Sequence, residues 1–94
     1  MRTVIQVIPR NDFKVYVFFN DGKIKLYDMS PLIGKGVFKQ ISNIDVFIKT
    51  CTVLNHTLAW DLLGNRDEYE CLDIDPCSIY SDGIDVDDPT KITA

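Results

Sequence analysis

The sequence has little histidine, cysteine or tryptophan. It holds one histidine, one tryptophan and three cysteines in 94 residues. No two cysteines form a Cys-x-x-Cys pair and their number is odd, so we expect reduced thiols and a cytoplasmic protein. No apolar run approaches the roughly 20 residues that span a bilayer, so we expect no membrane segment. The amino terminus also lacks the apolar core and cleavage site of a secretory signal, so we expect no signal peptide.

The spacing of potential ligands argues against a metal site. A zinc site would need Cys51, His56, Cys71 and Cys77 together, but structural zinc ligands usually come in closely spaced pairs. The acidic run over residues 82–88 has the carboxylates for calcium, but it places glycine second and lacks the closing glutamate of an EF-hand. We therefore expect no cofactor, and we expect the cysteines to be buried or half-buried free thiols.

Carboxylates are plentiful, but nothing beside them suggests catalysis. Four of them lie close together in the sequence: Asp67, Glu68, Asp73 and Asp75. No histidine, lysine or serine is placed next to them as a catalytic partner, so we expect no enzyme. Asp75 instead predicts the cap of a helical turn that begins at Pro76. Arg66 predicts a local ion pair with Asp67 or Glu70.

Residues 13–29 give the strongest structural signal, and they predict a β-hairpin at the centre of the fold. Asp21 and Gly22 predict a two-residue turn, because both tolerate the backbone angles of a tight turn. A three-residue loop would move the apolar side chains of one strand to the solvent face, so we expect the two-residue register. One face of this hairpin is then apolar and consists of Phe13, Val15, Val17, Phe19, Ile24 and Leu26. The other face carries Lys14, Lys23 and Lys25. Because these lysines keep it wet, we expect a helix on the apolar face only.

The remaining elements predict a small α+β fold. Residues 3–8 are rich in β-branched side chains and predict a strand that completes an antiparallel meander with the hairpin. Residues 51–60 predict a second hairpin, turned at Asn55-His56, with His56 as an exposed polar residue. Residues 37–49 predict one kinked helix or two short helices broken at Ser42-Asn43. The helical interpretation rests on an apolar stripe of Val37, Ile41, Ile44 and Ile48, broadened by Phe38 and Phe47.

The charge is unevenly distributed along the chain. Residues 1–60 carry eight Lys and Arg against four Asp and Glu, a net charge of +4, and residues 61–94 carry two against ten, a net charge of −8. This division argues against a basic surface for nucleic acid over the whole chain. It is consistent with docking of the acidic segment on the basic half or on a basic partner. We expect one compact domain over residues 1–82 and a flexible acidic tail over residues 83–94.

Several short motifs together resemble a known family. They are Phe18-Phe19-Asn20-Asp21-Gly22, Leu26-Tyr27-Asp28, Val37-Phe38, Trp60-Asp61, Gly64-Asn65-Arg66-Asp67-Glu68, Cys71-Leu72-Asp73-Ile74-Asp75-Pro76 and Ile79-Tyr80. Over residues 3–81 the chain resembles the small bacterial family called domain of unknown function 2442, and the motifs from Trp60 onward are similar to one subgroup. The resemblance implies a compact α+β domain with no catalytic residues. It also implies a small stand-alone protein, encoded beside a second small domain in an arrangement suggestive of a toxin–antitoxin pair.

Two functions follow as expectations. The first is a non-enzymatic interaction or regulatory module, the antitoxin-like partner of a small basic protein. The alternative is a small-ligand-binding domain with a pocket near Trp60, Arg66 and Tyr80. The residues expected to bind the ligand or partner are Trp60, Arg66, Asp67, Asp73, Asp75 and Tyr80. An exposed sheet edge and half-covered aromatics such as Tyr16 and Phe18 also favour a homodimer, and we expect no independent nucleic-acid binding.

Overall fold

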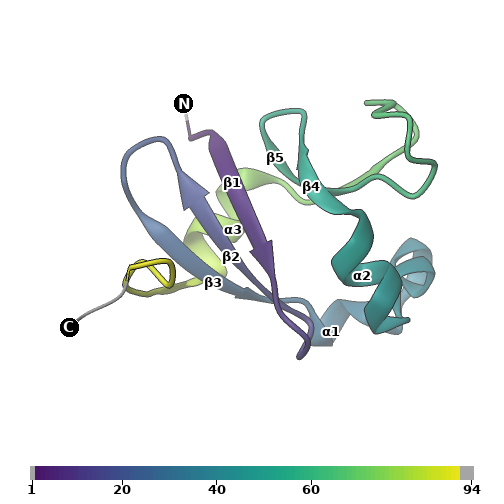
Figure 1. Cartoon of the computed structure of the whole chain (residues 1–94), viewed down its shortest axis with the longest axis horizontal. Coiled ribbons are helices and arrows are strands. Elements are labelled where there is room, and N and C mark those ends of the chain that lie inside the picture. Colours follow the sequence, from purple (N-terminus) through teal and green to yellow (C-terminus); the bar gives the residue numbers. More distant parts are fainter. Residues whose placement is uncertain (1, 92–94) are drawn as a thin grey trace.

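Two antiparallel sheets and a few short helices make up the chain, which confirms the α+β expectation. The computed structural model describes residues 2–91 (Figure 1). The first sheet has the strand order β1-β2-β3-β7, and the second has the order β4-β5-β6. The strands are β1 (Val4–Pro9), β2 (Lys14–Phe19), β3 (Ile24–Asp28), β4 (Cys51–Leu54), β5 (Thr57–Trp60), β6 (Leu72–Asp73) and β7 (Ile84–Asp85). The helices are α1 (Ser30–Ile33), the 3-10 helix η1 (Gly36–Ile41), α2 (Ile44–Thr50) and α3 (Pro76–Asp82).

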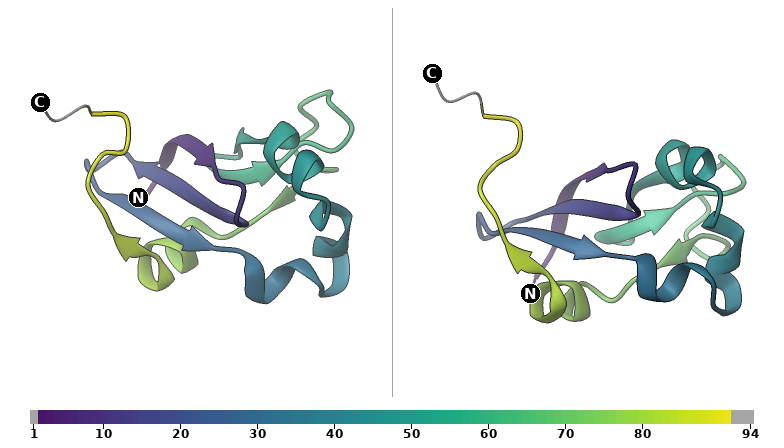
Figure 2. Two further views of the ribbon diagram at one scale, coloured as in Figure 1. Left: turned by 60° about the horizontal axis from the view of Figure 1, so that its bottom comes forward. Right: turned by 90° about the horizontal axis from the view of Figure 1, so that it is seen from below.

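The two sheets meet along β1 and enclose one core. The Val4 N–H donates to the His56 carbonyl at 2.9 Å, which ties β1 to the second hairpin. Helix α3 lies against one face of the first sheet, while α1, η1 and α2 gather at the other end of the molecule (Figures 1 and 2). The buried core consists of Val4, Val15, Val17, Phe19, Tyr27, Met29, Ile41, Phe47, Leu58, Trp60, Ile74 and Ile79. No helix of the described residues is long and apolar enough to cross a membrane.

The central hairpin forms, but the expected register is wrong by one residue. Phe18, and not Phe19, pairs with Ile24. The Phe19 N–H donates to the Lys23 carbonyl at 2.9 Å, so the loop has three residues and Gly22, with a φ of 89°, is the third of them. A type I turn followed by a left-handed glycine is the usual form of such a loop. As a result, Lys25 shares a face with the buried valines of β2.

Lys25 is tolerated on the buried face because its ammonium group has partners at the edge of the sheet. Its side chain is only 10% exposed, and its Nζ lies 2.7 Å from a carboxylate oxygen of Asp85 in β7. The same Nζ lies 4.8 Å from the centre of the Tyr80 ring on α3. A lysine can thus bury its stem and still keep its charge compensated. The sequence prediction of a two-residue loop did not allow for this. This contact also docks part of the acidic segment on the basic half.

The 37–49 region contains two helical elements, because the helical conformation is interrupted at Ser42-Asn43. The Asn43 side chain accepts hydrogen bonds from the Asp45 and Val46 N–H groups and caps α2. The break changes which side chains face the core: Ile41 and Phe47 are fully buried, whereas two members of the predicted stripe are exposed. Those two are Val37, at 57%, and Ile48, at 40%.

The second hairpin and the α3 cap form as predicted. Asn55 and His56 have φ angles of 54° and 61°, so both occupy the left-handed region that a two-residue turn of this kind requires, and His56 is exposed. The Asp75 carboxylate accepts the Cys77 N–H at 2.8 Å, and Pro76 opens α3. Short-range interactions therefore determine the structure of both the Asn55-His56 turn and the start of α3.

Part of the expected tail belongs to the first sheet. Residues 84–85 form β7, in which Asp85 pairs with Lys25 and Ile84 with Leu26. The Val86 N–H donates to the Ile24 carbonyl at 3.1 Å and extends the pairing by one residue. Residues 92–94, at the far end of the expected tail, lie outside the described residues.

Candidate functional site

The segment from Asp61 to Cys71, called the acidic loop below, projects from one end of the molecule (Figure 1). Asp61 folds its first half: one carboxylate oxygen accepts the Gly64 N–H at 3.1 Å and the other accepts the Arg66 N–H at 2.9 Å. Gly64 and Arg66 both have positive φ angles, of 71° and 55°. The first half of the loop is thus a compact turn around a carboxylate.

The Arg66 guanidinium fastens the loop to β4. Its Nη2 donates to the Val53 carbonyl at 2.9 Å, and its Nη1 donates to the Thr52 hydroxyl at 3.4 Å. The expected ion pair with Asp67 or Glu70 does not form; the ion pairs among the described residues are Arg10–Asp12 and Lys25–Asp85. Arg66 therefore acts as a structural clamp that leaves the neighbouring carboxylates free of ion pairs.

The second half of the loop is held by two further polar side chains. The Asn55 amide donates to the Glu68 carbonyl at 3.0 Å and to an Asp73 carboxylate oxygen at 3.4 Å. The Asp67 carboxylate accepts the Tyr69 N–H at 2.9 Å. Of the expected binding residues, Asp67 thus shapes the loop from within, and Asp73 bonds to the Asn55 amide that holds it.

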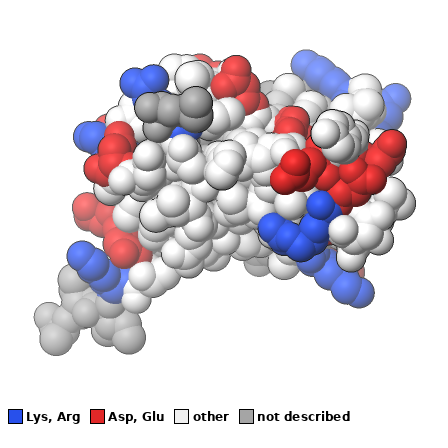
Figure 3. Space-filling view, turned by 90° about the horizontal axis from the view of Figure 1, so that it is seen from above, with Lys and Arg blue, Asp and Glu red and all other residues white. Residues whose placement is uncertain are grey.

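The tip of the loop presents an aromatic ring between two carboxylates. Tyr69 is 94% exposed, and Glu68 and Glu70 on either side of it are exposed too. Leu63, in the first half of the loop, is 65% exposed. Figure 3 shows acidic side chains gathered at this end of the molecule, with basic side chains beside them. The loop tip thus exposes an aromatic ring and two carboxylates to solvent.

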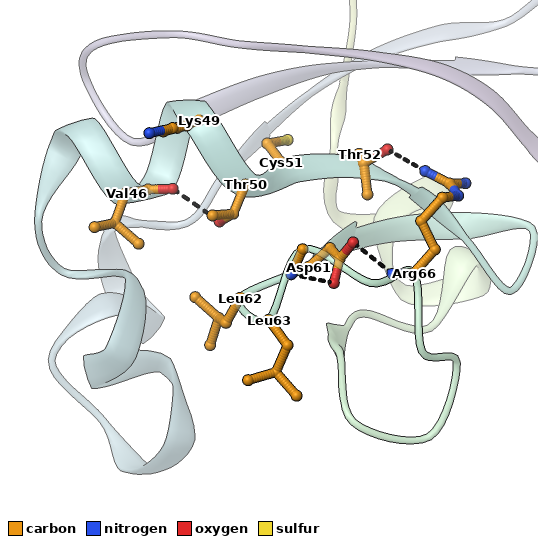
Figure 4. Close-up of a pocket in the computed structure, with 10 residues that line it drawn as sticks. Val46, Lys49, Thr50, Cys51, Thr52, Asp61, Leu62, Leu63 and Arg66 are labelled. Carbon is orange, nitrogen blue, oxygen red and sulfur yellow. Dashed lines mark hydrogen bonds between the residues drawn. The ribbon is translucent and has the colours of Figure 1, made fainter.

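Two open clefts adjoin the loop, and Arg66 lines both. The larger, of about 540 Å³, lies between α2, the start of β4 and residues 61–66. Figure 4 shows Lys49 and Arg66 toward opposite ends of this cleft, with Leu62 and Leu63 along its wall. The smaller, of about 410 Å³, lies between the Asn55-His56 turn and Glu68. Neither cleft is lined by Trp60 or Tyr80, so the three residues of the expected pocket are not brought together around either of them.

Trp60 and Tyr80 serve the packing of the fold. Trp60 is fully buried with its ring centre 5.5 Å from that of Phe47, and its Nε1 has no hydrogen-bond partner among the described residues. Tyr80 packs edge-on against Phe19 at 5.1 Å and donates its hydroxyl to Asp21 at 2.8 Å. The Arg2 guanidinium lies over the Tyr80 ring at 4.0 Å. Tyr80 therefore joins α3 to the first hairpin and to the N-terminal segment.

Two of the three thiols, those of Cys51 and Cys71, lack the environment of a nucleophile; the third, Cys77, is exposed, contrary to the expectation of buried or half-buried thiols. Burial raises the pKa of Cys51 to about 12. Burial raises the pKa of Cys71 as well, and the nearby Asp73 carboxylate adds to this effect. Both thiols are thus protonated near neutral pH. A reactive cysteine, in contrast, needs a lowered pKa. Among residues 2–91, no three His, Cys, Asp or Glu side chains are grouped so that they could hold a metal ion.

The sequence interpretation passed over Tyr69, the most exposed large side chain of the site. The available signal was its position: an aromatic residue between Glu68 and Glu70 in a polar segment without alternation. Such a ring has no strand or helix face through which to reach the core. An aromatic residue in that context is a better guide to a contact surface than a tryptophan inside a strand.

Comparison with known proteins gives one match. The model of the family described as "Protein of unknown function (DUF2442)" matches residues 4–85. No curated protein and no solved structure matches the chain. The matched span runs from the first residue of β1 to the last residue of β7, and so includes every strand of both sheets in the described residues. The chain therefore belongs to the DUF2442 family.

Proposed function

We propose that this protein is a non-enzymatic interaction module that binds a small basic protein through the acidic loop, as an antitoxin-like partner. The single observation that carries the proposal is the loop tip, where the 94% exposed Tyr69 stands between the exposed Glu68 and Glu70. Tyrosines are enriched among the residues that dominate protein interfaces, because the ring supplies contact area and the hydroxyl supplies a hydrogen bond.

The charge around the tip supports a basic partner. Residues 61–75 contain six Asp and Glu and one Arg, and the Arg66 guanidinium binds a carbonyl and a hydroxyl instead of a carboxylate. The negative field of this segment is therefore not cancelled by ion pairs within the described residues. Such a field speeds the encounter with a basic protein and disfavours acidic ones.

The hydrogen bonds of the loop also favour binding. Asp61, Arg66 and Asn55 fix it at three points, so less conformational freedom is lost when a partner binds. None of these bonds uses the Glu68 or Glu70 carboxylate, and these two side chains have no hydrogen bond or ion pair within the described residues. The loop is thus a prepared surface with charges left for an external partner.

The test is co-expression and co-purification with the product of the neighbouring gene. The variant Glu68→Gln/Glu70→Gln removes two charges with little change in shape, and Tyr69→Ala removes the ring. We expect both to reduce recovery of the partner, the first most strongly at low salt, where charge attraction is least screened. Asp82→Asn/Asp87→Asn is the matched control, because it removes two exposed charges away from the loop.

Three results would contradict the proposal. The first is a neighbouring product that does not co-purify with the wild-type protein. The second is equal recovery with the loop variants and the wild type. The third is an equal loss of recovery with the control variant, which would mean that net charge and not the loop is responsible.

A second candidate function, binding of a small ligand, is favoured by the larger cleft alone. Its volume of about 540 Å³ falls within the range of ligand sites, and it is lined by Lys49 and Arg66 beside the apolar Leu62 and Leu63. A small carboxylate with an apolar body has the matching chemistry. A screen of such acids by thermal shift tests this, because a ligand that binds only the folded protein raises its melting temperature. A shift that is unchanged in Arg66→Met and Lys49→Met would contradict this location.

A further inference from the structure

The outer face of the first sheet carries apolar side chains that lie outside the core cluster. Strand pairing puts Phe18 beside Ile24, Tyr16 beside Leu26 and Ile8, and Leu26 beside Ile84. Side chains of directly paired residues point to the same side of a sheet. The apolar residues of the outer face are therefore Ile8, Tyr16, Phe18, Ile24, Leu26 and Ile84, with the exposed Gln6 paired to Phe18 among them. None of the six belongs to the core cluster or to the side chains packed against it.

The chain leaves this face without a covering layer. Helix α3 covers the opposite face, where Tyr80 packs on Phe19, and Figure 2 shows no helix of the described residues across the outer one. Ile84 is 67% exposed, Ile8, Tyr16, Ile24 and Leu26 are half-buried, and Phe18 at their centre is 9% exposed. A sheet that is apolar on both faces normally has a packed layer on each. The outer face is therefore a surface suited to a partner.

The edges of the sheet are less suited to association than its face. Strand β1 has an irregular register at Ile5 and ends at Pro9, which cannot donate to a neighbouring strand. The other edge, β7, has only two residues. Bulges, prolines and short edge strands all discourage edge-to-edge pairing. Association through this sheet is therefore expected at its outer face and not at its edges.

The charges at the rim of this face balance one another. Lys14 and Asp28 are paired across β2 and β3 at one end of it. Arg10, which lies over the Tyr16 ring, forms an ion pair with Asp12 at 2.8 Å. The rim thus has no net charge to attract the basic partner proposed for the acidic loop. A neutral rim with neighbouring opposite charges can complement itself, as a two-fold interface requires.

We propose that this outer face binds the same face of a second copy of the chain, related by a two-fold axis that runs along the strands between β2 and β3. This axis places Lys14 of one copy opposite Asp28 of the other, and Tyr16 opposite Leu26. Two such sheets pack face to face about 10 Å apart, as in a β-sandwich. The dimer leaves the acidic loop outside the interface, so it does not depend on the function proposed above.

The size of the face sets the strength of the dimer. Four strands about 4.8 Å apart and five residues long at about 3.4 Å each give a flat footprint of roughly 300 Å². Stable interfaces bury about 800 Å² per partner, so even with the added area of the side chains this dimer is a weak one. We therefore expect a reversible equilibrium, with a monomer at low micromolar concentration and a dimer as the concentration approaches millimolar.

Sedimentation velocity over this concentration range tests the proposal. Leu26→Lys puts a charge in the middle of the apolar face without touching the core cluster. We expect it to weaken dimerisation at least about tenfold, because an unpaired charge would have to be buried. Ile48→Lys is the matched control, since it changes a 40% exposed apolar residue on α2 and should dimerise like the wild type. Circular dichroism confirms that each variant is folded.

A mixing experiment tests the placement of the axis. Lys14→Asp and Asp28→Lys each place like charges opposite one another in a homodimer, so each alone should dimerise at least about tenfold more weakly. Mixed in equal amounts, the two variants pair opposite charges across both contacts and should recover dimer. If Asp28→Lys fails to fold because the contacts of Asp28 with Ser30 are lost, Lys14→Asp alone still tests the contact.

Three outcomes would overturn the inference. A wild-type protein that stays monomeric throughout the range would mean that the face is unoccupied or is kept for a different partner. Equal dimerisation of Leu26→Lys and the wild type would place the interface elsewhere. Folded single variants that are weakened but do not recover dimer on mixing would overturn the two-fold axis described here.

Discussion

Replacing Arg66 with methionine should loosen the acidic loop without unfolding the protein. The change removes the hydrogen bonds to the Val53 carbonyl at 2.9 Å and to the Thr52 hydroxyl at 3.4 Å, and it keeps an apolar stem of similar length. The bond between the Arg66 N–H and Asp61 remains. A charged donor contributes about 1.5–3 kcal/mol when well shielded, and because Arg66 is exposed we take about 1 kcal/mol for the loss.

Amide hydrogen exchange is the assay, since it reports local opening. A loss of about 1 kcal/mol corresponds to about fivefold faster exchange. This increase should be seen at the Tyr69 and Glu70 amides, which bond to Asp67 within the loop. Amides of β2 and β3 should be unchanged. Lys49→Met is the control, because it removes an exposed cation at the same cleft with no ion pair among the described residues.

Two results would refute the reasoning about Arg66. Unchanged loop exchange would mean that the guanidinium bonds do not hold the loop. Faster exchange throughout the protein would mean that Arg66 supports the whole fold and not one segment.

Three further predictions concern the scaffold. The hydrogen bond from Lys25 lowers the pKa of Asp85 below its usual 3.8, so the contact that supports β7 is complete above that pH and is lost as the pH falls through the lowered pKa. Acid should therefore lower the protection of the β7 amides relative to unstructured amides at the same pH, and Asp85→Asn should show lower protection already at neutral pH; identical protection profiles against pH would contradict this. His56→Gly should stabilise the protein by about 0.5 kcal/mol, or about 2–4 °C in melting temperature, because glycine accepts the φ of 61° without strain; a lower melting temperature would mean that the entropy of the unfolded glycine outweighs the relief. Trp60→Phe should cost less than about 1.5 kcal/mol in urea denaturation, since it also removes a buried N–H without a partner; a loss of about 3 kcal/mol or more would show that the indole packing dominates.

The parts of the fold that depend on neighbouring residues could be predicted from the sequence. The Asn55-His56 turn and the Asp75 cap both follow from backbone preferences and from hydrogen bonds that span two or three residues. The family resemblance rests on motifs of the same kind, and the family is confirmed over residues 4–85. Interactions of this kind depend only on residues close together in the sequence, so the sequence predicts them.

The register of the first hairpin could not be predicted, because the deciding contact is distant in the sequence. If only the hairpin is considered, Lys25 is expected on the solvent-exposed face. Only when Asp85 and Tyr80 are brought to it by β7 and α3 does the buried position become favourable. The helical stripe failed in a related way, since the periodicity of a single helix was applied across the break at Ser42-Asn43.

The structure gives several of the expected binding residues a structural task, while binding by this segment stays a prediction. Arg66 fastens the acidic loop to β4 and Asp67 accepts an N–H within the loop. Asp73, in β6, accepts from the Asn55 amide that also holds the loop. Trp60 was expected to line a pocket, yet its place among the four buried residues of β5 makes it part of the core. Exposure decides between these roles, and residue type alone does not determine it.

The pairing of β7 with β3 affects the order in which parts of the chain fold during synthesis. The hairpin of β2 and β3 joins neighbouring residues and can form early, whereas β7 must wait until α3 has been synthesised and packed. A nascent chain emerges from the ribosome N-terminus first, so for much of synthesis the edge of β3 is bare and Lys25 lacks its carboxylate. That interval, when an open strand edge adjoins an apolar sheet face, is when the polypeptide is most vulnerable to aggregation and most in need of a chaperone.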